Sequence, residues 1–138
     1  PTLGLPINFK GYIDRVELTN QCLTIWDYKT GSFTSSDLSL GAMEDLWKGT
    51  KGKPLQVLFY AWLLDKMGTF PHPLPWRSGM FKLQSGAPEI LLGGAVVNKT
   101  KDISTEVLQV FENALIEYLE EVYTNDLPFT EIPKFEFK

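Results

Sequence analysis

The chain has 138 residues, of which 43% are hydrophobic, and its 13 Lys and Arg against 17 Asp and Glu give a net charge of −4. This length fits a single domain over residues 1–138, and the apolar content supports a packed core, which excludes intrinsic disorder. The single cysteine, Cys22, excludes a disulfide framework and a multi-cysteine metal site. No apolar stretch approaches the ~18 residues of a membrane span and no secretory signal is visible, so we expect a cytoplasmic protein without membrane contact.

The N-terminal part of the sequence predicts a β-hairpin. Strands are expected roughly at 8–18 and 22–30, with a turn at 19–21 between them. A two-residue loop in this turn makes position i pair with position 41 − i. Because side chains alternate along a strand, this register sorts them into two faces. One face holds Tyr12, Asp14, Val16, Leu18, Leu23, Ile25, Asp27 and Lys29, and the other holds Ile13, Arg15, Glu17, Thr24, Trp26 and Tyr28.

A connection and a helix follow the hairpin. The segment 31–53 is rich in loop-forming residues, with one short helix expected near 43–47. Pro54 then opens a helix over about 54–67, because proline suits the first helical turn. Gly68 favours the end of that helix.

The second half of the chain predicts two more strands and a long helix. After a loop over 69–79, candidate strands lie at 80–84 and 90–97. A helix capped by Asp102 or Ser104 and ending near residue 123 follows, because its apolar residues recur at helical spacing. The order strand, strand, helix, strand, strand, helix predicts an α/β fold with a mixed sheet flanked by helices.

Two carboxylates and a lysine gather at one end of the first hairpin face. In the predicted register Asp14 lies opposite Asp27, and like charges directly opposite each other destabilise a sheet. A divalent cation offsets that cost, because Mg²⁺ takes oxygen ligands from one or two carboxylates together with substrate phosphate. Lys29 lies on the same face and suits the orientation of a water or the stabilisation of developing negative charge. The alternative is a solvated surface ion pair, which is common on hairpins.

Three motifs resemble the RecB-like branch of the PD-(D/E)XK nuclease superfamily. Residues 11–16 (GYIDRV) match its G-x-I-D-R-[IV] pattern, residues 26–31 (WDYKTG) match D-Y-K-T-G, and Gln56 with Tyr60 match its Q-x-x-x-Y helix. The motifs occur in the family's order and spacing. The resemblance implies an α/β, restriction-endonuclease-like core and a Mg²⁺- or Mn²⁺-dependent deoxyribonuclease.

The resemblance also implies a role for each matching residue. Asp14 and Asp27 are the expected metal ligands, with the backbone carbonyl of Tyr28 as a further ligand. Lys29 is the expected catalytic lysine. The helical pair formed by Gln56 and Tyr60, which share one helix face, is expected to place DNA or the lysine, with ordinary helix packing as the alternative.

Three lysines precede the Q-x-x-x-Y helix in a loop spaced by glycines: Lys48, Lys51 and Lys53. This loop is expected either to touch DNA phosphates or to be a solvated connection without a binding role.

Two features of the family lie outside the sequence. Members carry a helix upstream of the hairpin, whose Glu or His completes the metal site, so we expect this chain to be an N-terminally incomplete part of a nuclease domain. Relatives in helicase–nuclease assemblies often end in a cysteine cluster. The tail over 125–138 contains no cysteine, so no iron–sulfur cluster is expected in this chain.

The charge is unevenly distributed along the chain. The net charge of −4 argues against a phosphate-binding surface. However, residues 1–101 hold 11 Lys and Arg against 8 Asp and Glu, whereas residues 102–138 hold 2 against 9, so the part with the motifs is mildly basic. The resemblance implies an exonuclease that acts on DNA with a helicase region or subunit in recombination and repair. The alternative is a non-catalytic DNA-binding or scaffolding module with an incomplete metal site.

Overall fold

The computed structural model describes residues 4, 6–70, 73–86, 88–90, 100–124, 126 and 128, with 88–90 described by their backbone alone. Within these residues the predicted order of strands and helices is confirmed. The short helix expected near 43–47 is found there as a 3-10 helix, and a second 3-10 helix precedes it. The elements are β1 (Arg15–Leu18), β2 (Leu23–Lys29), η1 (Ser35–Leu38), η2 (Met43–Trp47), α1 (Gly52–Met67), β3 (Trp76–Lys82), β4 (Pro88–Ile90) and α2 (Thr105–Thr124).

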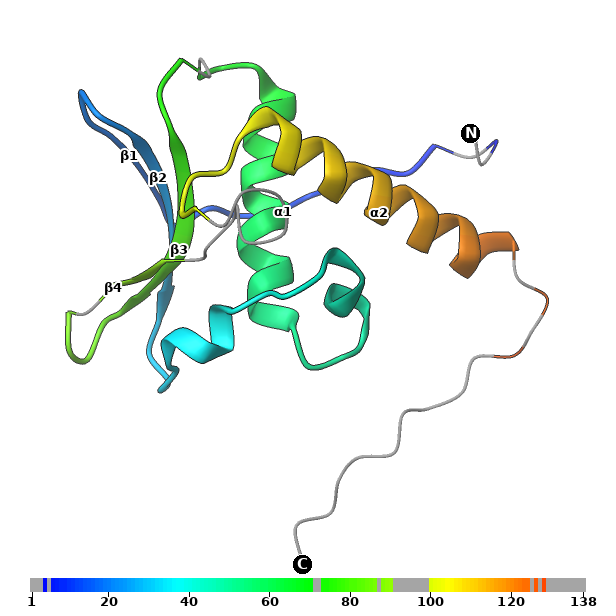
Figure 1. Ribbon diagram of the computed structural model, residues 1–138, viewed down its shortest axis with the longest axis horizontal. Helices are drawn as coiled ribbons and strands as arrows, with labels where there is room; N and C mark the ends of the chain where they lie inside the picture. The colour runs from blue at the N-terminus through cyan, green and yellow to red at the C-terminus, as the bar shows by residue number, and fades with distance from the viewer. Residues whose placement is uncertain are drawn as a thin grey trace, which may run out of the picture.

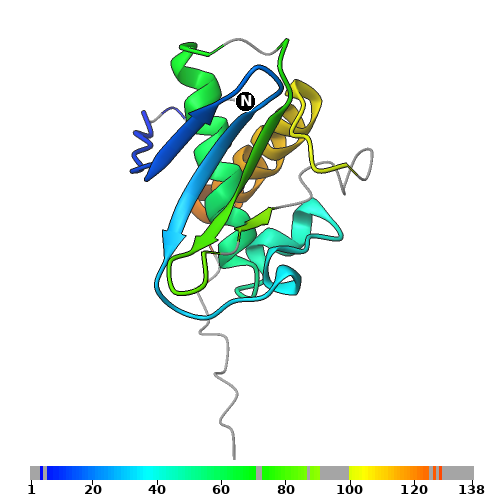
Figure 2. The same ribbon diagram turned by 90° about the vertical axis from the view of Figure 1, so that its left-hand side faces the viewer.

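The strands form one mixed sheet in the order β1-β2-β3-β4. β2 runs parallel to β3, and the β1–β2 and β3–β4 pairs are antiparallel. α1 makes the crossover between β2 and β3, because parallel neighbours cannot be joined by a tight turn. Both long helices lie on one side of the sheet (Figure 1), and in the turned view the sheet stands in front of them (Figure 2). The α/β class with a mixed sheet is therefore confirmed.

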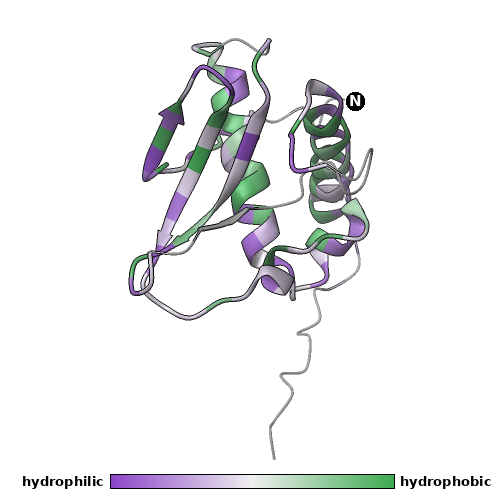
Figure 3. Ribbon diagram, turned by 60° about the vertical axis from the view of Figure 1, so that its left-hand side comes forward, coloured by the Kyte–Doolittle hydropathy of each residue, from purple (hydrophilic) through white to green (hydrophobic). Residues whose placement is uncertain are grey.

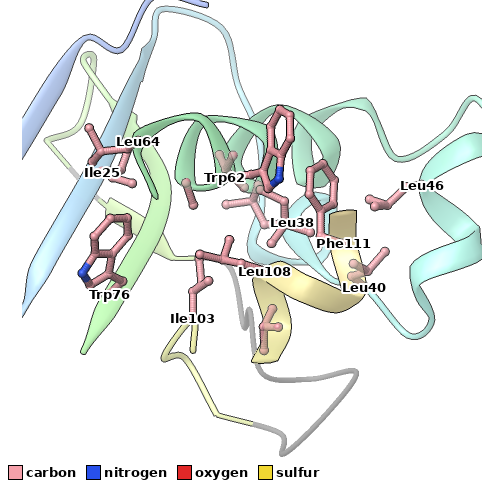
Figure 4. Packing of buried hydrophobic residues seen from close by; sticks show 14 of the residues in the cluster. Ile25, Leu38, Leu40, Leu46, Trp62, Leu64, Trp76, Ile103, Leu108 and Phe111 are labelled. Carbon is pink, nitrogen blue, oxygen red and sulfur yellow. The ribbon is translucent and has the colours of Figure 1, made fainter. Parts of the chain in front are cut away.

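The core fills the space between the sheet and the two helices. Ile25 of β2 and Trp76 of β3 are buried against it, at 1% and 0% exposure. Trp62 of α1 and Phe111 of α2 meet edge to face between the helices, with ring centroids 6.3 Å apart. Figure 4 shows these side chains facing one another across the core. Within the described part of the chain, no helix has the length and apolarity needed to cross a membrane.

The parallel pair sorts its side chains onto two faces. Registered neighbours in a parallel pair share a face, and the hydroxyl of Ser78, the neighbour of Ile25, donates to the carbonyl of Val57 in α1 at 2.7 Å. We call the residues on this side the helix-facing rows: Leu23, Ile25, Asp27 and Lys29 in β2, and Trp76, Ser78, Met80 and Lys82 in β3. Along β2 the colour changes from green in its first half to purple and white in its second (Figure 3), so each row begins apolar and ends charged.

The first strand is much shorter than predicted. The register 41 − i is confirmed from Leu18↔Leu23 to Arg15↔Trp26, but β1 begins at Arg15 rather than near residue 8. The preceding segment leaves the sheet and packs on α1, where the ring of Phe9 meets those of Phe59 and Trp62 edge to face. These ring contacts with α1 replace further strand pairing, although Phe9 itself stays 37% exposed.

The third strand begins earlier than predicted. Residues 76–79 belong to β3, so the predicted loop over 69–79 is wrong for its last four residues. The prolines before Trp76 and the glycine at 79 conceal the strand in the sequence. Its pairing comes from tertiary context, because β2 lies alongside its whole length and the amide of Ile103 donates to the carbonyl of Trp76 at 2.6 Å. Of the strand predicted at 90–97, only Ile90 is described, and it is the last residue of β4. Residues 91–99 lie outside the described residues.

The long helix is close to its predicted bounds. Of the two candidate caps, Ser104 is the one used, because its hydroxyl accepts a hydrogen bond from the amide of Val107 at 3.2 Å. Asp102 instead accepts a hydrogen bond from the guanidinium of Arg77 at 2.9 Å, an interaction that raises the pKa of Arg77 above its ordinary value.

Candidate active site

The charged end of the helix-facing row of β2 forms the centre of the site. Asp27 is 5% exposed, and a buried carboxylate is costly unless it is paired and hydrogen-bonded. One oxygen, Oδ1, accepts a hydrogen bond from Nε2 of Gln56 at 3.1 Å. The other, Oδ2, lies 2.9 Å from Nζ of Lys29.

The contact of Oδ2 with Lys29 is an ion pair without the angles of a hydrogen bond. Oδ2 is buried and forms no hydrogen bond of normal geometry in the described part of the chain, although the Lys29 ammonium lies 2.9 Å away. Buried carboxylate oxygens are usually saturated with donors. Asp27 Oδ2 therefore lacks a regular hydrogen bond in the described residues. It lies beside the Lys29 ammonium, near the carboxyl end of β2.

The amide of Gln56 links the charged groups to α1. Its Oε1 accepts a hydrogen bond from Lys29 Nζ at 3.1 Å, while its Nε2 donates to Asp27 Oδ1. The same Nε2 lies 3.1 Å from the hydroxyl oxygen of Tyr60, one helical turn further on. The two predicted motifs thus meet, and Asp27, Lys29, Gln56 and Tyr60 form one hydrogen-bonded network.

Asp14 reaches this region by a different route from the predicted one. It lies one residue before β1, so it does not pair with Asp27 inside the sheet. Its Oδ2 instead accepts a hydrogen bond from the amide of Tyr28 at 2.7 Å. The side chain replaces the backbone acceptor that β1 no longer supplies, and it brings the carboxylate next to the strand segment that carries Asp27 and Lys29.

The predicted pairing of Tyr12 with Lys29 is wrong. Tyr12 precedes β1, and its side chain is 74% exposed. The ammonium of Lys10 lies 5.4 Å from the centre of its ring. The departure of this segment from the sheet is the physical reason, because Tyr12 no longer lies beside β2.

Gly11 has a role that the sequence analysis missed. A Cβ atom at this position would lie 3.0 Å from side-chain atoms of Tyr60 and of Leu63. Glycine allows the backbone to approach α1 this closely, and any larger residue would press on the network tyrosine. The signal in the sequence is the glycine that opens the GYIDRV motif.

A family model described as PD-(D/E)XK nuclease superfamily matches residues 2–134. This chain belongs to the PD-(D/E)XK nuclease superfamily. Neither a curated protein nor a solved structure matches it. Membership supports an enzyme that hydrolyses phosphodiester bonds, and PD-(D/E)XK nucleases generally use divalent metal ions.

The residues of this PD-(D/E)XK domain fit a metal held by few protein ligands. Among the described residues, no group of three or more His, Cys, Asp or Glu side chains could hold an ion. Mg²⁺, however, needs only one or two carboxylates, because it retains waters and binds substrate phosphate. The buried Asp27 Oδ2, which lacks a hydrogen-bond donor in this part of the chain, is the atom that fits such an ion best.

The loop lysines differ in how they are engaged. Nζ of Lys48 lies 2.6 Å from Asp45 Oδ1, a hydrogen bond that raises the pKa of Lys48 and lowers that of Asp45. Nζ of Lys51 donates to the carbonyl of Ser39 at 2.9 Å. Lys53 contributes to lowering the pKa of Asp37, which is held down mainly by the amide of Thr34. Lys48 and Lys51 thus brace their own loop, and the DNA contact predicted for the three lysines stays a prediction.

Arg15 lies on the opposite face of the hairpin from the network, as predicted. Its guanidinium pairs with Glu17, and the side chains of Tyr28 and Glu17 raise its pKa above the ordinary value. Arg15 therefore braces the outer face of the hairpin behind Asp27.

Proposed function

We propose that this chain is a metal-dependent DNA nuclease domain of the RecB type. The observation that carries the proposal is the buried carboxylate of Asp27, which is fixed by Gln56, lies beside Lys29 and has one oxygen without a hydrogen-bond donor in the described residues. The GYIDRV, WDYKTG and Q-x-x-x-Y motifs support the RecB type. They also support exonuclease action on DNA with a helicase partner in recombination and repair.

In this proposal Asp27 and Asp14 hold Mg²⁺ or Mn²⁺, with the backbone carbonyl of Tyr28 as a further ligand. The ion supplies Lewis acidity and lowers the pKa of a bound water. Lys29 contributes a fixed positive charge where negative charge develops on the phosphate. Its ammonium is oriented by Gln56 Oε1, which accepts one of its hydrogen bonds, and by the carboxylate of Asp27.

The test is the cleavage of DNA by variants that remove one charge at a time. With Mg²⁺ present, Asp27→Asn and Lys29→Met are each expected to lower kcat by about 10²- to 10³-fold, the usual loss for one electrostatic group of an active site. Circular dichroism should show that both variants keep the fold of the unaltered protein. Glu17→Gln is the matched control, because it neutralises an exposed carboxylate on the same hairpin and should cleave normally. Normal cleavage by either site variant contradicts the mechanism.

The second candidate is a DNA-binding module without catalysis. It is favoured by one observation, namely that no third His, Cys, Asp or Glu joins Asp14 and Asp27 in the part of the chain that the structure describes. Binding of DNA without cleavage in both Mg²⁺ and Mn²⁺, by the full-length protein, would support this alternative over the nuclease.

A further inference from the structure

We infer that Lys82 is a second lysine that contacts substrate phosphate, beside Lys29, an inference that rests on the proposed function. Lys82 ends the helix-facing row of β3 as Lys29 ends that of β2, and the two are registered neighbours in the parallel pair. Both therefore lie on the same face at the carboxyl ends of the strands. In open α/β sheets, ligands bind at this edge.

The two lysines differ in how their charge is balanced. Lys29 forms an ion pair with the carboxylate of Asp27 and donates a hydrogen bond to the amide oxygen of Gln56. Lys82 forms no ion pair with a carboxylate in the described residues, whereas Lys66, on α1, is paired with Glu112 at 2.6 Å. Like charges on neighbouring strands repel. An anion between them removes that cost, and the anion that a nuclease brings is a phosphodiester.

An aromatic contact holds Lys82 in place without neutralising it. Its Nζ lies 5.0 Å from the centre of the Phe33 ring, which is 3% exposed. A cation over an aromatic face is stabilised by the ring's quadrupole and keeps its full charge. The backbone is also fastened, because the amide of Leu83 donates to the carbonyl of Lys29 at 3.0 Å.

The geometry assigns the two lysines different tasks. Lys29 contacts the metal-binding carboxylate, so it acts where the bond breaks. Lys82 lies one strand away, a separation of about 4.8 Å. It grips phosphate in the ground state as well as in the transition state. Loss of its charge should therefore raise KM and leave kcat nearly unchanged.

The experiment changes the charge of Lys82 and keeps its packing. Lys82→Met retains a long unbranched stem over Phe33, and Lys82→Arg retains the positive charge. Lys66→Met is the control, because it makes the same change on α1 at a cation already paired with Glu112. Binding of a short single-stranded DNA is measured over a series of salt concentrations without divalent ions, in an Asp27→Asn background.

We expect the salt dependence of binding to reveal the lost contact. For Lys82→Met the slope of log Kobs against log[salt] should fall in magnitude by about 0.7, the value for one phosphate contact on a single strand. Lys82→Arg should restore the slope, and Lys66→Met should not alter it. With an intact Asp27 and Mg²⁺, Lys82→Met should raise KM several-fold.

Two results overturn the inference. One is a slope for Lys82→Met equal to that of Lys66→Met, and the other is an equal loss in Lys82→Met and Lys82→Arg, which would indicate a packing role. If the unaltered protein cleaves DNA while Lys82→Met keeps its slope, the inference about Lys82 alone fails. If the unaltered protein neither binds nor cleaves DNA, the proposed function fails and this inference fails with it.

Discussion

Gln56 determines the orientation of the charged groups at the site. Its amide can satisfy Asp27 and Lys29 together only with Nε2 toward the carboxylate and Oε1 toward the ammonium, as found. Hydrogen bonds to charged groups contribute about 1.5–3 kcal/mol. The amide therefore matters to the position of both groups, although it has no charge of its own.

Replacement of Gln56 by methionine tests this role. Gln56→Met keeps the length of the side chain but removes its hydrogen bonds with Asp27, Lys29 and Tyr60. We therefore expect kcat to fall about 10- to 100-fold, the rate equivalent of one hydrogen bond to a charged group. The measurement is DNA cleavage at saturating substrate. Gln109→Met is the control, because Gln109 forms an exposed amide pair with Asn113 on α2. Equal activities of the two variants would show that Gln56 packs without positioning.

At the level of single residues, the motifs indicated which side chains come together, but not how Asp14 approaches them. Asp27 and Lys29 lie on one face of β2, as the strand periodicity predicts, and Gln56 and Tyr60 lie on one face of α1, as the helix periodicity predicts. Hydrogen bonds of Gln56 join these two faces. The sequence motifs did not predict that the side chain of Asp14 accepts a hydrogen bond from the amide of Tyr28. The position of Asp14 depends on where β1 begins, and that is decided by the packing of the preceding segment on α1.

At the level of elements, Glu112 joins the two long helices. Its Oε2 accepts a hydrogen bond from Nε1 of Trp62 at 2.9 Å and lies 2.6 Å from Nζ of Lys66. The hydrogen bond from Lys66 is the main cause that lowers the pKa of Glu112, followed by that from Trp62. This ionised carboxylate therefore favours the packed arrangement of α1 on α2.

This lowered pKa predicts a stability that depends on pH. The folded pKa of Glu112 lies below its ordinary value near 4.5, so its contribution is present above that value and is lost as the pH falls through the folded pKa. Glu112→Gln should thus show a smaller decrease in unfolding temperature than the unaltered protein between about pH 6 and pH 3. Thermal unfolding followed by circular dichroism measures this. Glu117→Gln, on the same helix, serves as the control and should follow the unaltered protein, and equal decreases in all three would contradict the prediction.

The elements themselves were predictable where local pattern and tertiary packing agree. α2 follows its apolar spacing, and α1 ends before Gly68, whose backbone is left-handed at φ 68°, although α1 begins at Gly52 and not at the predicted Pro54. β3 shows the opposite case. The prolines before Trp76 and the glycine at position 79 do not indicate a strand, and the pairing of β3 arises from β2 alongside. Contacts between segments distant in sequence leave little trace in a local pattern.

At the level of the whole molecule, metal binding should be visible as a gain in stability. A ligand that binds the folded state alone stabilises it by about 2.7 kcal/mol at a concentration 100 times its Kd. We expect Mg²⁺ or Mn²⁺ to raise the unfolding temperature of the unaltered protein and of Glu17→Gln. Asp27→Asn should lose most of this rise. An equal rise in Asp27→Asn would place the ion elsewhere.

The α/β architecture follows from the order of elements alone, because two antiparallel strands and a helix leading to a further strand leave few arrangements of one sheet. The sequence did not reveal the sidedness of the molecule. Both long helices cover the same face of the sheet (Figure 1). That choice depends on Trp62 and Phe111 meeting between the helices, a contact between residues far apart in the chain.

The hydrogen bond from the amide of Leu83 to the carbonyl of Lys29 makes the turn after β3 a natural place for a spectroscopic reporter. Leu83 is 51% exposed, so a dye attached there has room, through a cysteine introduced after the free Cys22 has been replaced by serine. Its backbone is one hydrogen bond from Lys29. Its emission should therefore respond to occupancy of the site in real time, which would let the arrival of an ion and the arrival of a nucleic acid be timed separately in a stopped-flow instrument.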